Sequence, residues 1–226
     1  MSLVESYPEL ITALTEFYGL PDQGPAVNDL FEAVLTVSLG RSLAPVQAGA
    51  IRLGLRDAGL SDPDSLASAD ASALAEIARC SGVPRATKTL RPLQRLARWV
   101  VDRGGAETLA DAPTEALRDE LLGINGIGPA SADAILLHAL GRPIYPVDRA
   151  TYRILVRHAW LDPSSEYDEA RDVVQRCDPD YSAALARLSA WFERVGVSYC
   201  RPSVAKCLKC PLRPFLPEDG PRETDS

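Results

Sequence analysis

Short runs of helix-type periodicity, separated by proline and glycine, are the feature that most restricts the fold of this chain. Within each run apolar residues recur every three or four positions, and the alternation typical of a half-buried strand is nearly absent. Breakers such as Pro45, Pro84 and Pro113 stand between the runs. The pattern predicts an all-α protein of about ten short helices. The clearest helices are expected at 29–39, 92–101, 115–122, 130–140, 149–159, 167–176 and 181–195.

The composition allows one large hydrophobic core or two small ones. Of the 226 residues, 46% are hydrophobic and 24% are charged, which is ordinary for a globular protein. No apolar run approaches the roughly 20 residues that cross a bilayer. Glu5 and Glu9 stand where a secretory signal would carry basic residues. We therefore expect a soluble cytoplasmic protein, without a membrane segment and without Sec-type export.

Charge is distributed unevenly along the chain. The formal net charge is -7, so bulk charge alone should not draw the protein to nucleic acid. Residues 1–75 carry a large acidic excess, whereas 85–98 contains only basic charges, at helical spacing, with Pro92 expected to begin the helix. We call Lys88, Arg91, Arg95 and Arg98 the basic stripe. It indicates either a solvated helix face or a surface for phosphates.

A glycine-rich turn joins two of the expected helices. Gly123-Ile-Asn-Gly126-Ile-Gly128 precedes Pro129, and proline suits the first position of a helix because its missing N–H needs no partner there. Glycines allow positive φ and the close approach of another backbone. Such a turn leaves free amides at a helix N-terminus, where they bind an anion such as phosphate. The alternative is a plain connector between packed helices.

An aspartate stands where an extended segment meets a helix. Tyr145-Pro-Val-Asp148 follows the glycine turn and one helical run, and the next run begins at Arg149. An aspartate in this place is an ordinary helix N-cap. The same carboxylate can instead work as a catalytic acid or base. The order of glycine turn, helix, Pro-Val-Asp and helix favours the catalytic interpretation.

Three of the five cysteines, Cys200, Cys207 and Cys210, lie within eleven residues. An odd number of cysteines in a chain that is not expected to be secreted argues against a disulfide framework. The spacing Cys-x6-Cys-x2-Cys therefore indicates a metal or cluster site.

Over most of its length, from about Phe31 to Cys210, the chain resembles the helix-hairpin-helix DNA glycosylases of the endonuclease III family, including the 3-methyladenine glycosylases of that branch. The resemblance is strongest in Gly126-Ile-Gly128, Ser131-Ala-Asp-Ala-Ile-Leu136, Val147-Asp148-Arg149 and the clustered cysteines. It implies a two-domain helical fold and a base that is flipped out of the duplex into the cleft between the domains. The implied partner is double-stranded DNA with a lesion or an abasic site.

The resemblance also assigns roles and boundaries. Asp148 corresponds to the catalytic acid–base residue, where a carboxylate stabilises an oxocarbenium-like state or orients the attacking water. The hairpin amides grip the phosphate near the lesion. The residues expected to contact DNA are Leu39, Lys88, Gly126, Ile127, Gly128 and Arg149. The implied domains are 25–141, which carries the hairpin, and 1–24 plus 142–216, which carries the cysteine loop; 217–226 is expected to form a flexible tail.

Two family positions carry residues that alter the expected chemistry. Bifunctional members have a lysine four residues after the first hairpin glycine, where this chain has Ala130. Without an amine no Schiff base forms, which predicts a monofunctional enzyme. Where the family offers a glutamine to fill the space left by the flipped base, this chain has Leu39. Leu39 is either an apolar wedge between bases or a core residue.

The family completes the cysteine pattern with a fourth cysteine that holds a 4Fe-4S cluster, but here that position is Leu216. Such clusters prefer four thiolates. The alternatives are a cluster with Glu218, Asp219 or solvent as fourth ligand, a zinc site, or no metal. We favour the cluster because the family spacing is kept and cations surround it. These cations are Lys206, Lys209 and Arg213.

Together these patterns predict a monomeric, nucleoid-associated DNA glycosylase. It would hydrolyse the N-glycosidic bond of a damaged or mismatched base, with little or no AP-lyase activity. A rival hypothesis is a catalytically silent protein on the same fold that binds lesions or abasic sites. A more distant one is a helical DNA-binding module with a zinc loop and no base pocket.

Overall fold

The computed structural model describes residues 2–21 and 29–223, and every regular element in this part of the chain is a helix. No strand occurs among these residues; one isolated bridge joins Cys200 and Ala205. The predicted all-α class is confirmed. The expected domain boundary at 24/25 and the last three residues of the expected tail lie outside the described residues. Over the same residues, no helix is both long and apolar enough to cross a membrane.

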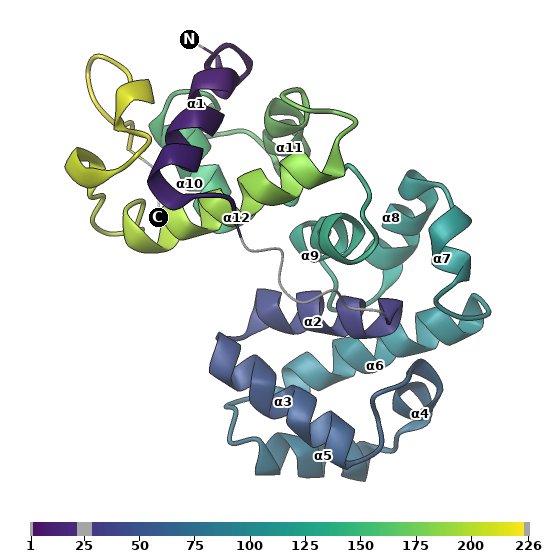
Figure 1. Ribbon diagram of the computed structural model, residues 1–226. Coiled ribbons are helices and arrows are strands. Elements are labelled where there is room, and N and C mark those ends of the chain that lie inside the picture. Colours follow the sequence, from purple (N-terminus) through teal and green to yellow (C-terminus); the bar gives the residue numbers. More distant parts are fainter. Residues whose placement is uncertain (1, 22–28, 224–226) are drawn as a thin grey trace. The chain divides into compact units, whose positions relative to one another are not determined.

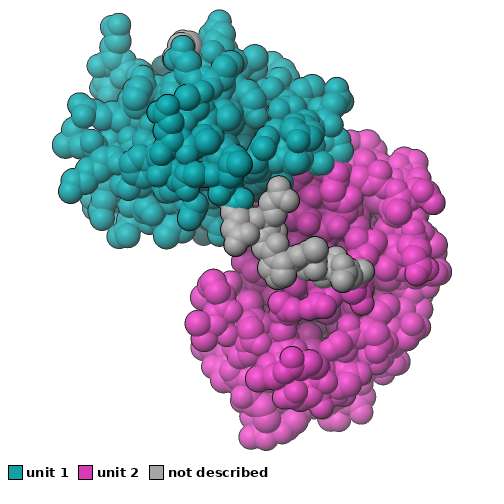
Figure 2. Space-filling view, in the orientation of Figure 1, with its two compact units in different colours: residues 1–24, 143–226 teal, residues 25–142 magenta. Residues whose placement is uncertain are grey.

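The chain forms two compact units, coloured separately in Figure 2. Unit 1 consists of residues 1–24 and 143–226, and unit 2 of residues 25–142. Unit 1 therefore combines both ends of the chain, and unit 2 is one continuous stretch.

Unit 2 is a bundle of short helices (Figure 1). In chain order they are α2 Leu30–Ser42, α3 Pro45–Asp57, α4 Pro63–Ser68, α5 Ala71–Cys80, α6 Ala86–Asp102, α7 Thr108–Asp111, α8 Thr114–Gly123, α9 Pro129–Ala134 and the π-helical turn η1 Ile135–Ala139. Helix α6 packs against α2, α4 and α5, and α2 also contacts η1. Their shared core contains the fully buried side chains of Val34, Leu93, Leu96 and Leu136.

Helix α6 corrects one expectation from the sequence. Pro92 was expected to begin this helix, but the helix begins at Ala86 and Pro92 lies inside it. An internal proline removes one backbone hydrogen bond and crowds the preceding turn. Packing of Leu90 and its apolar neighbours into the unit 2 core offsets this penalty, since Leu90 is fully buried.

Unit 1 is built on two longer helices, α1 and α12, and two shorter ones, α10 and α11, and the cysteine loop follows α12 (Figure 1). The elements are α1 Leu3–Tyr18, α10 Arg149–Arg157, α11 Tyr167–Gln175, α12 Ser182–Ser198 and the 3-10 turns η2 Cys207–Lys209 and η3 Arg213–Phe215. Helix α12 packs along α10, and α1 contacts both α11 and α12. The Nε1–H of Trp191 donates to the Gly19 carbonyl at 3.1 Å, which fixes the end of α1 to α12.

The sequence analysis missed α1, α3, α4, α5 and α7. Local capping signals were present: Ser2 and Glu5 form a capping box at α1, and Asp70 accepts the Ala73 N–H at α5. The Arg222 N–H donates to the Arg157 carbonyl at 3.0 Å, so the chain is attached to α10 at least as far as Arg222.

Candidate functional site

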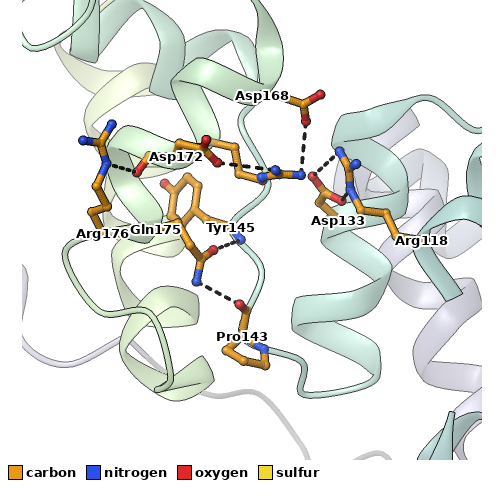
Figure 3. A network of polar contacts seen from close by, with 9 residues as sticks. Arg118, Asp133, Pro143, Tyr145, Asp168, Asp172, Gln175 and Arg176 are labelled. Atoms are coloured by element: carbon orange, nitrogen blue, oxygen red, sulfur yellow. Dashed lines mark hydrogen bonds and ion pairs between the residues drawn. The ribbon is translucent and has the colours of Figure 1, made fainter. Parts of the chain in front are cut away.

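The glycine turn connects α8 and α9 in unit 2, and a buried ion pair joins the two helices (Figure 3). Arg118 Nε donates to Asp133 Oδ1 at 2.7 Å, and Arg118 Nη2 lies 3.4 Å from Oδ2. Asp133 is fully buried. Removal of one partner from such a pair leaves an uncompensated buried charge. The pair therefore fixes how α8 and α9 meet.

Gly126 is required at its position for two reasons. Its φ is +99°, and a Cβ there would lie 2.7 Å from Pro92 Cγ. Arg95 Nη1 also donates to the Asn125 carbonyl at 2.8 Å. Helix α6 therefore supports the turn from outside, which explains why Pro92 sits within the helix at this contact.

The turn presents backbone amides from glycines rather than from Ile127. Ile127 is buried and its N–H donates to the Ile124 carbonyl at 2.9 Å. Gly126 and Gly128 are exposed, and among the described residues no acceptor is found for the N–H of Gly126, Gly128 or Ala130. Gly128 is the N-cap of α9 and has no side chain to supply one. An anion therefore has three amides available at this turn.

Two of the four residues of the basic stripe, Arg95 and Arg98, hydrogen-bond to backbone carbonyls within unit 2. Arg95 donates to the turn and Arg98 Nη2 donates to the Ala67 carbonyl at 2.5 Å. Lys88 and Arg91 are exposed, and no side-chain hydrogen bond or ion pair of either is found within the described part of the chain. The surface open to phosphates is therefore narrower than the sequence indicated.

Leu39 does not lie at the surface. It is fully buried in α2, beside the buried residues Leu35 and Val34. The wedge interpretation is wrong for the described fold, because a side chain without solvent exposure cannot enter a base stack. The core alternative is the correct one. Ala130, in the first turn of α9, is half-buried.

In unit 1, α11 holds the extended segment that precedes Asp148, and Figure 3 shows the contacts of Gln175 with Pro143 and Tyr145 of this segment. The Tyr145 N–H donates to Gln175 Oε1 at 3.0 Å, and Gln175 Nε2 donates to the Pro143 carbonyl at 2.8 Å. The Val147 N–H donates to the Tyr167 hydroxyl at 3.2 Å. Two side chains of α11 thus satisfy the backbone of a segment that belongs to no regular element.

Asp148 is the N-cap of α10. Its Oδ1 accepts the Thr151 N–H at 2.7 Å, which fixes the orientation of the carboxyl group, and the residue is half-buried. Arg149 beside it is exposed. The N-cap interpretation therefore holds, and it does not exclude catalysis, since one carboxylate can do both.

The position of α10 depends on a close crossing with α12. A Cβ at Gly196 would lie 2.3 Å from the Ala150 Cβ, so only glycine permits this approach. Ala150 stands two residues after Asp148. Gly196 thus sets where the N-terminus of α10 lies within unit 1.

The three clustered cysteines come together as predicted. Cys200, Cys207 and Cys210 line one small cavity, and Leu216, at the position of the family's fourth cysteine, lines it too. The cavity is very small, about 10 Å³ in volume. The remaining lining residues are Arg157, His158, Tyr199 and Arg213. Glu218 and Asp219 are exposed and do not line the cavity, which argues against them as ligands.

The side chains of the cysteine cavity are not arranged as a ready metal site. Within residues 2–21 and 29–223, no three side chains of the ligand types lie near enough together to hold one metal ion. Burial raises the pKa of the Cys210 thiol to about 11, so a bound cation is needed to keep it as a thiolate. Arg157 Nη1 lies 3.2 Å from Cys200 Sγ and donates to the Arg201 carbonyl at 2.8 Å.

Sequence reasoning missed the residues that hold these groups in place. Gln175 and Tyr167 lie in a helical run, where nothing in the neighbouring sequence marks them as functional. Gly196 follows another helical run, and no nearby residue indicates that it has a role. Arg157 and His158 fall at the end of α10, where a basic residue is common. Only the contacts of the folded chain identify them.

The comparisons with known proteins agree with this arrangement. No protein-family model matches the chain. It is 29% identical over 207 residues, 89% of its own length, to the predicted DNA repair glycosylase MJ1434 of Methanocaldococcus jannaschii, of which the match covers 91%. It superposes with a TM-score of 0.73 on endonuclease III from a non-covalent DNA complex, at 18% identity and over 96% of each chain. It superposes with a TM-score of 0.67 on the 3-methyladenine DNA glycosylase of H. pylori, at 21% identity, over 86% of this chain and 97% of that one.

Proposed function

Because the chain has the fold of the helix-hairpin-helix DNA glycosylases, we propose that it excises a damaged or mismatched base from double-stranded DNA by hydrolysis of the N-glycosidic bond. The sequence relative carries the name of a DNA repair glycosylase, and the structural neighbours include 3-methyladenine and thymine-DNA glycosylases. We propose that the protein acts on DNA as a monomer.

One observation carries the proposal: the α10 N-cap delivers a half-buried carboxylate whose orientation is fixed by the Thr151 N–H at 2.7 Å. Loss of a base leaves positive charge on the sugar, and a preorganised carboxylate stabilises that charge or orients the attacking water. Asp148 is the residue proposed for this role. Gln175 and Tyr167 hold Asp148 in position through their hydrogen bonds to the preceding segment 143–147.

The DNA backbone is proposed to bind at the glycine turn. The N–H groups of Gly126, Gly128 and Ala130 have no acceptor among the described residues and lie at the start of α9, where the helix dipole also favours a phosphate. Lys88 and Arg91 of the basic stripe and Arg149 beside Asp148 are exposed cations that would neutralise further phosphates.

We propose that the reaction stops at the abasic site. Ala130 stands in the first turn of α9 where bifunctional relatives carry the attacking lysine, so no Schiff base can form there. Incubation with abasic DNA and borohydride should trap no covalent adduct, whereas endonuclease III included as a positive control should be trapped. A strong adduct with this protein would show that another amine performs the lyase step.

Cys200, Cys207 and Cys210 are the residues proposed to hold a 4Fe-4S cluster, since all three line one cavity. The cluster would brace the loop, with no part in cleavage of the glycosidic bond. The loop in turn presents Lys206, Lys209 and Arg213, all exposed, as cations for the DNA backbone.

A base-release screen tests the proposed activity. Duplexes that each carry one oxidised, alkylated, deaminated or mismatched base are incubated with the protein, and hot alkali then converts abasic sites into strand breaks. Wild-type protein should release at least one base and Asp148→Asn should not. The second candidate, a silent lesion binder, is favoured by the loss of the lysine at Ala130. It prevails if both proteins bind lesion DNA equally and neither releases a base.

A further inference from the structure

Two buried hydroxyl groups of unit 1 form a hydrogen bond close to Asp148. The Tyr145 hydroxyl lies 3.2 Å from Thr151 Oγ1, so one of the two donates to the other. The exposed fraction is 0% for Tyr145 and 2% for Thr151. Buried hydroxyls are costly unless they are hydrogen-bonded, whereas phenylalanine and valine of nearly the same shape would pack there without that cost. Packing alone therefore does not account for the two hydroxyls.

Thr151 connects this hydroxyl pair to the carboxylate. Its backbone N–H donates to Asp148 Oδ1 at 2.7 Å, while its side chain contacts the Tyr145 hydroxyl. Threonine is branched at Cβ and has few χ1 rotamers, so a contact that holds its side chain also restricts the direction of its backbone N–H. The orientation of the Asp148 carboxyl group therefore depends on the Tyr145 hydroxyl.

Tyr145 is itself fixed at its backbone by α11. Its N–H donates to Gln175 Oε1 at 3.0 Å. Gln175 Nε2 donates to the carbonyls of Pro143 and Pro179, at 2.8 and 3.1 Å. A continuous series of contacts thus runs from α11 through Tyr145 and Thr151 to the carboxylate. Buried polar networks of this kind make the surrounding structure rigid.

We propose that Tyr145 and Thr151 are positioning residues for base excision, and that their hydroxyl pair holds the Asp148 carboxylate in its working orientation. This role rests on the proposed function of Asp148. Neither hydroxyl is exposed, so both act through Asp148 and not on the substrate. Such positioning matters for the rate, because a displacement of about 1 Å at a reacting group can lower the rate by roughly 10²-fold.

Substitutions that remove single hydroxyl groups from the full-length protein test this role. Tyr145→Phe and Thr151→Val each remove one hydroxyl of the pair, and Thr151→Ser keeps it. Tyr152→Phe is the matched control, because the Tyr152 hydroxyl, also on α10, donates to the Pro163 carbonyl at 2.6 Å. Single-turnover base release on the best substrate of the screen gives the rate constant at saturating protein and the protein concentration at half saturation.

Tyr145→Phe and Thr151→Val should lower the saturating rate constant by roughly 10-fold, between the effect of one lost hydrogen bond and that of a 1 Å displacement. The half-saturating concentration should not change, since no residue proposed to contact DNA is altered. Thr151→Ser and Tyr152→Phe should behave like wild type.

The double variant Tyr145→Phe, Thr151→Val separates positioning from stability. Replacement of both hydrogen-bonding partners by apolar groups of the same shape is nearly neutral for stability. The double variant should therefore unfold in urea at the same midpoint as wild type and still release base as slowly as the single variants. A merely structural pair would give wild-type rates in this stable protein.

Hydrogen exchange of the Thr151 amide, followed by NMR, tests the same role without any need for activity. The exchange should be faster in Tyr145→Phe than in wild type, because the contact with Asp148 opens more often, and unchanged in Tyr152→Phe. A double variant that releases base as fast as wild type would overturn the proposal, and so would an unchanged exchange rate in Tyr145→Phe. Wild-type protein that releases no base from any duplex would refute the proposed function instead, and the exchange measurement would still decide whether the hydroxyl pair holds Asp148.

Discussion

The N-termini of α9 and α10 differ in what accepts hydrogen bonds from their free backbone N–H groups. Each leaves backbone N–H groups without partners inside the helix. At α10 a carboxylate of the chain itself takes one of them, through the Asp148 to Thr151 contact of 2.7 Å. At α9 the N-cap is Gly128, which has no side chain, and the amides stay open. One end holds an acid in a fixed orientation and the other offers a place for a foreign anion.

The supports of the two ends also differ. The turn before α9 is braced by α6, through the contact of Pro92 with Gly126 and the Arg95 hydrogen bond to Asn125. The segment before α10 is braced by Gln175 of α11. Each end therefore depends on contacts with a distant helix as well as on its own local sequence, so each can be disturbed from a distance.

The largest effect is expected from a substitution of Asp148 that removes the negative charge and keeps the N-cap of α10. Asparagine caps helices as well as aspartate does, so Asp148→Asn should fold like wild type and retain its melting temperature within a few degrees. Base release should fall about 10²- to 10⁴-fold, the usual contribution of a general acid or base. Single-turnover assays on the best substrate of the screen measure the rate.

Asp70→Asn is the matched control for that variant. Asp70 caps α5 with the same geometry, its side chain accepting the Ala73 N–H at 2.7 Å, but it lies on the exposed surface of unit 2. Its base release should equal that of wild type. An equal loss of activity in the two variants would mean that Asp148 is a cap and nothing more.

A smaller loss of activity, with a loss of stability, is expected when α10 is displaced. Gly196→Ala places a Cβ where the Ala150 Cβ already lies, 2.3 Å away. Overpacking of this kind costs about 1–3 kcal/mol, and displacement of the carboxylate by about 1 Å can lower the rate by roughly 10²-fold. Urea denaturation and base release report the two effects. The double variant Gly196→Ala, Ala150→Gly should regain both, and a double variant as impaired as the single one would contradict the steric explanation.

At the α9 end the two hairpin glycines should respond differently to alanine. In Gly126→Ala the alanine would have to adopt a positive φ, and its Cβ would lie 2.7 Å from Pro92 Cγ. The substitution should therefore destabilise unit 2 by about 1–3 kcal/mol. Gly128 has φ -95° with nothing within 4 Å of an added Cβ, so Gly128→Ala should change the stability little. Thermal melts distinguish them; similar losses in both variants would refute the role assigned to Pro92.

The sequence predicted those parts of the molecule that short-range rules control. Helical periodicity located most of the helices that carry the site, and the turn chemistry of Gly126 and the N-cap position of Asp148 follow from local geometry. Leu39 was misjudged because exposure depends on which face of α2 meets the unit 2 core. The start of α6 was misjudged because tertiary packing outweighed the local penalty of Pro92.

The supporting residues could not have been predicted, for a different reason. Gln175 contacts a segment 30 or more positions earlier, and Arg157 contacts the cysteine loop 43 or more positions later. No periodicity or motif encodes contacts at such separations. The same holds for His158, whose contact with Leu212 spans 54 positions.

The smallest effect should come from the basic stripe, and it separates cations that bind DNA from cations that hold the fold. Lys88 is exposed and has no partner among the described residues, whereas Arg98 donates to the Ala67 carbonyl. Removal of a cation that neutralises one phosphate reduces the slope of log K against log salt by about one. Lys88→Ala should therefore lower the salt slope of duplex binding by about one and leave the melting temperature unchanged. Arg98→Ala should do the reverse, and a salt slope near zero in wild type would contradict binding through phosphates altogether.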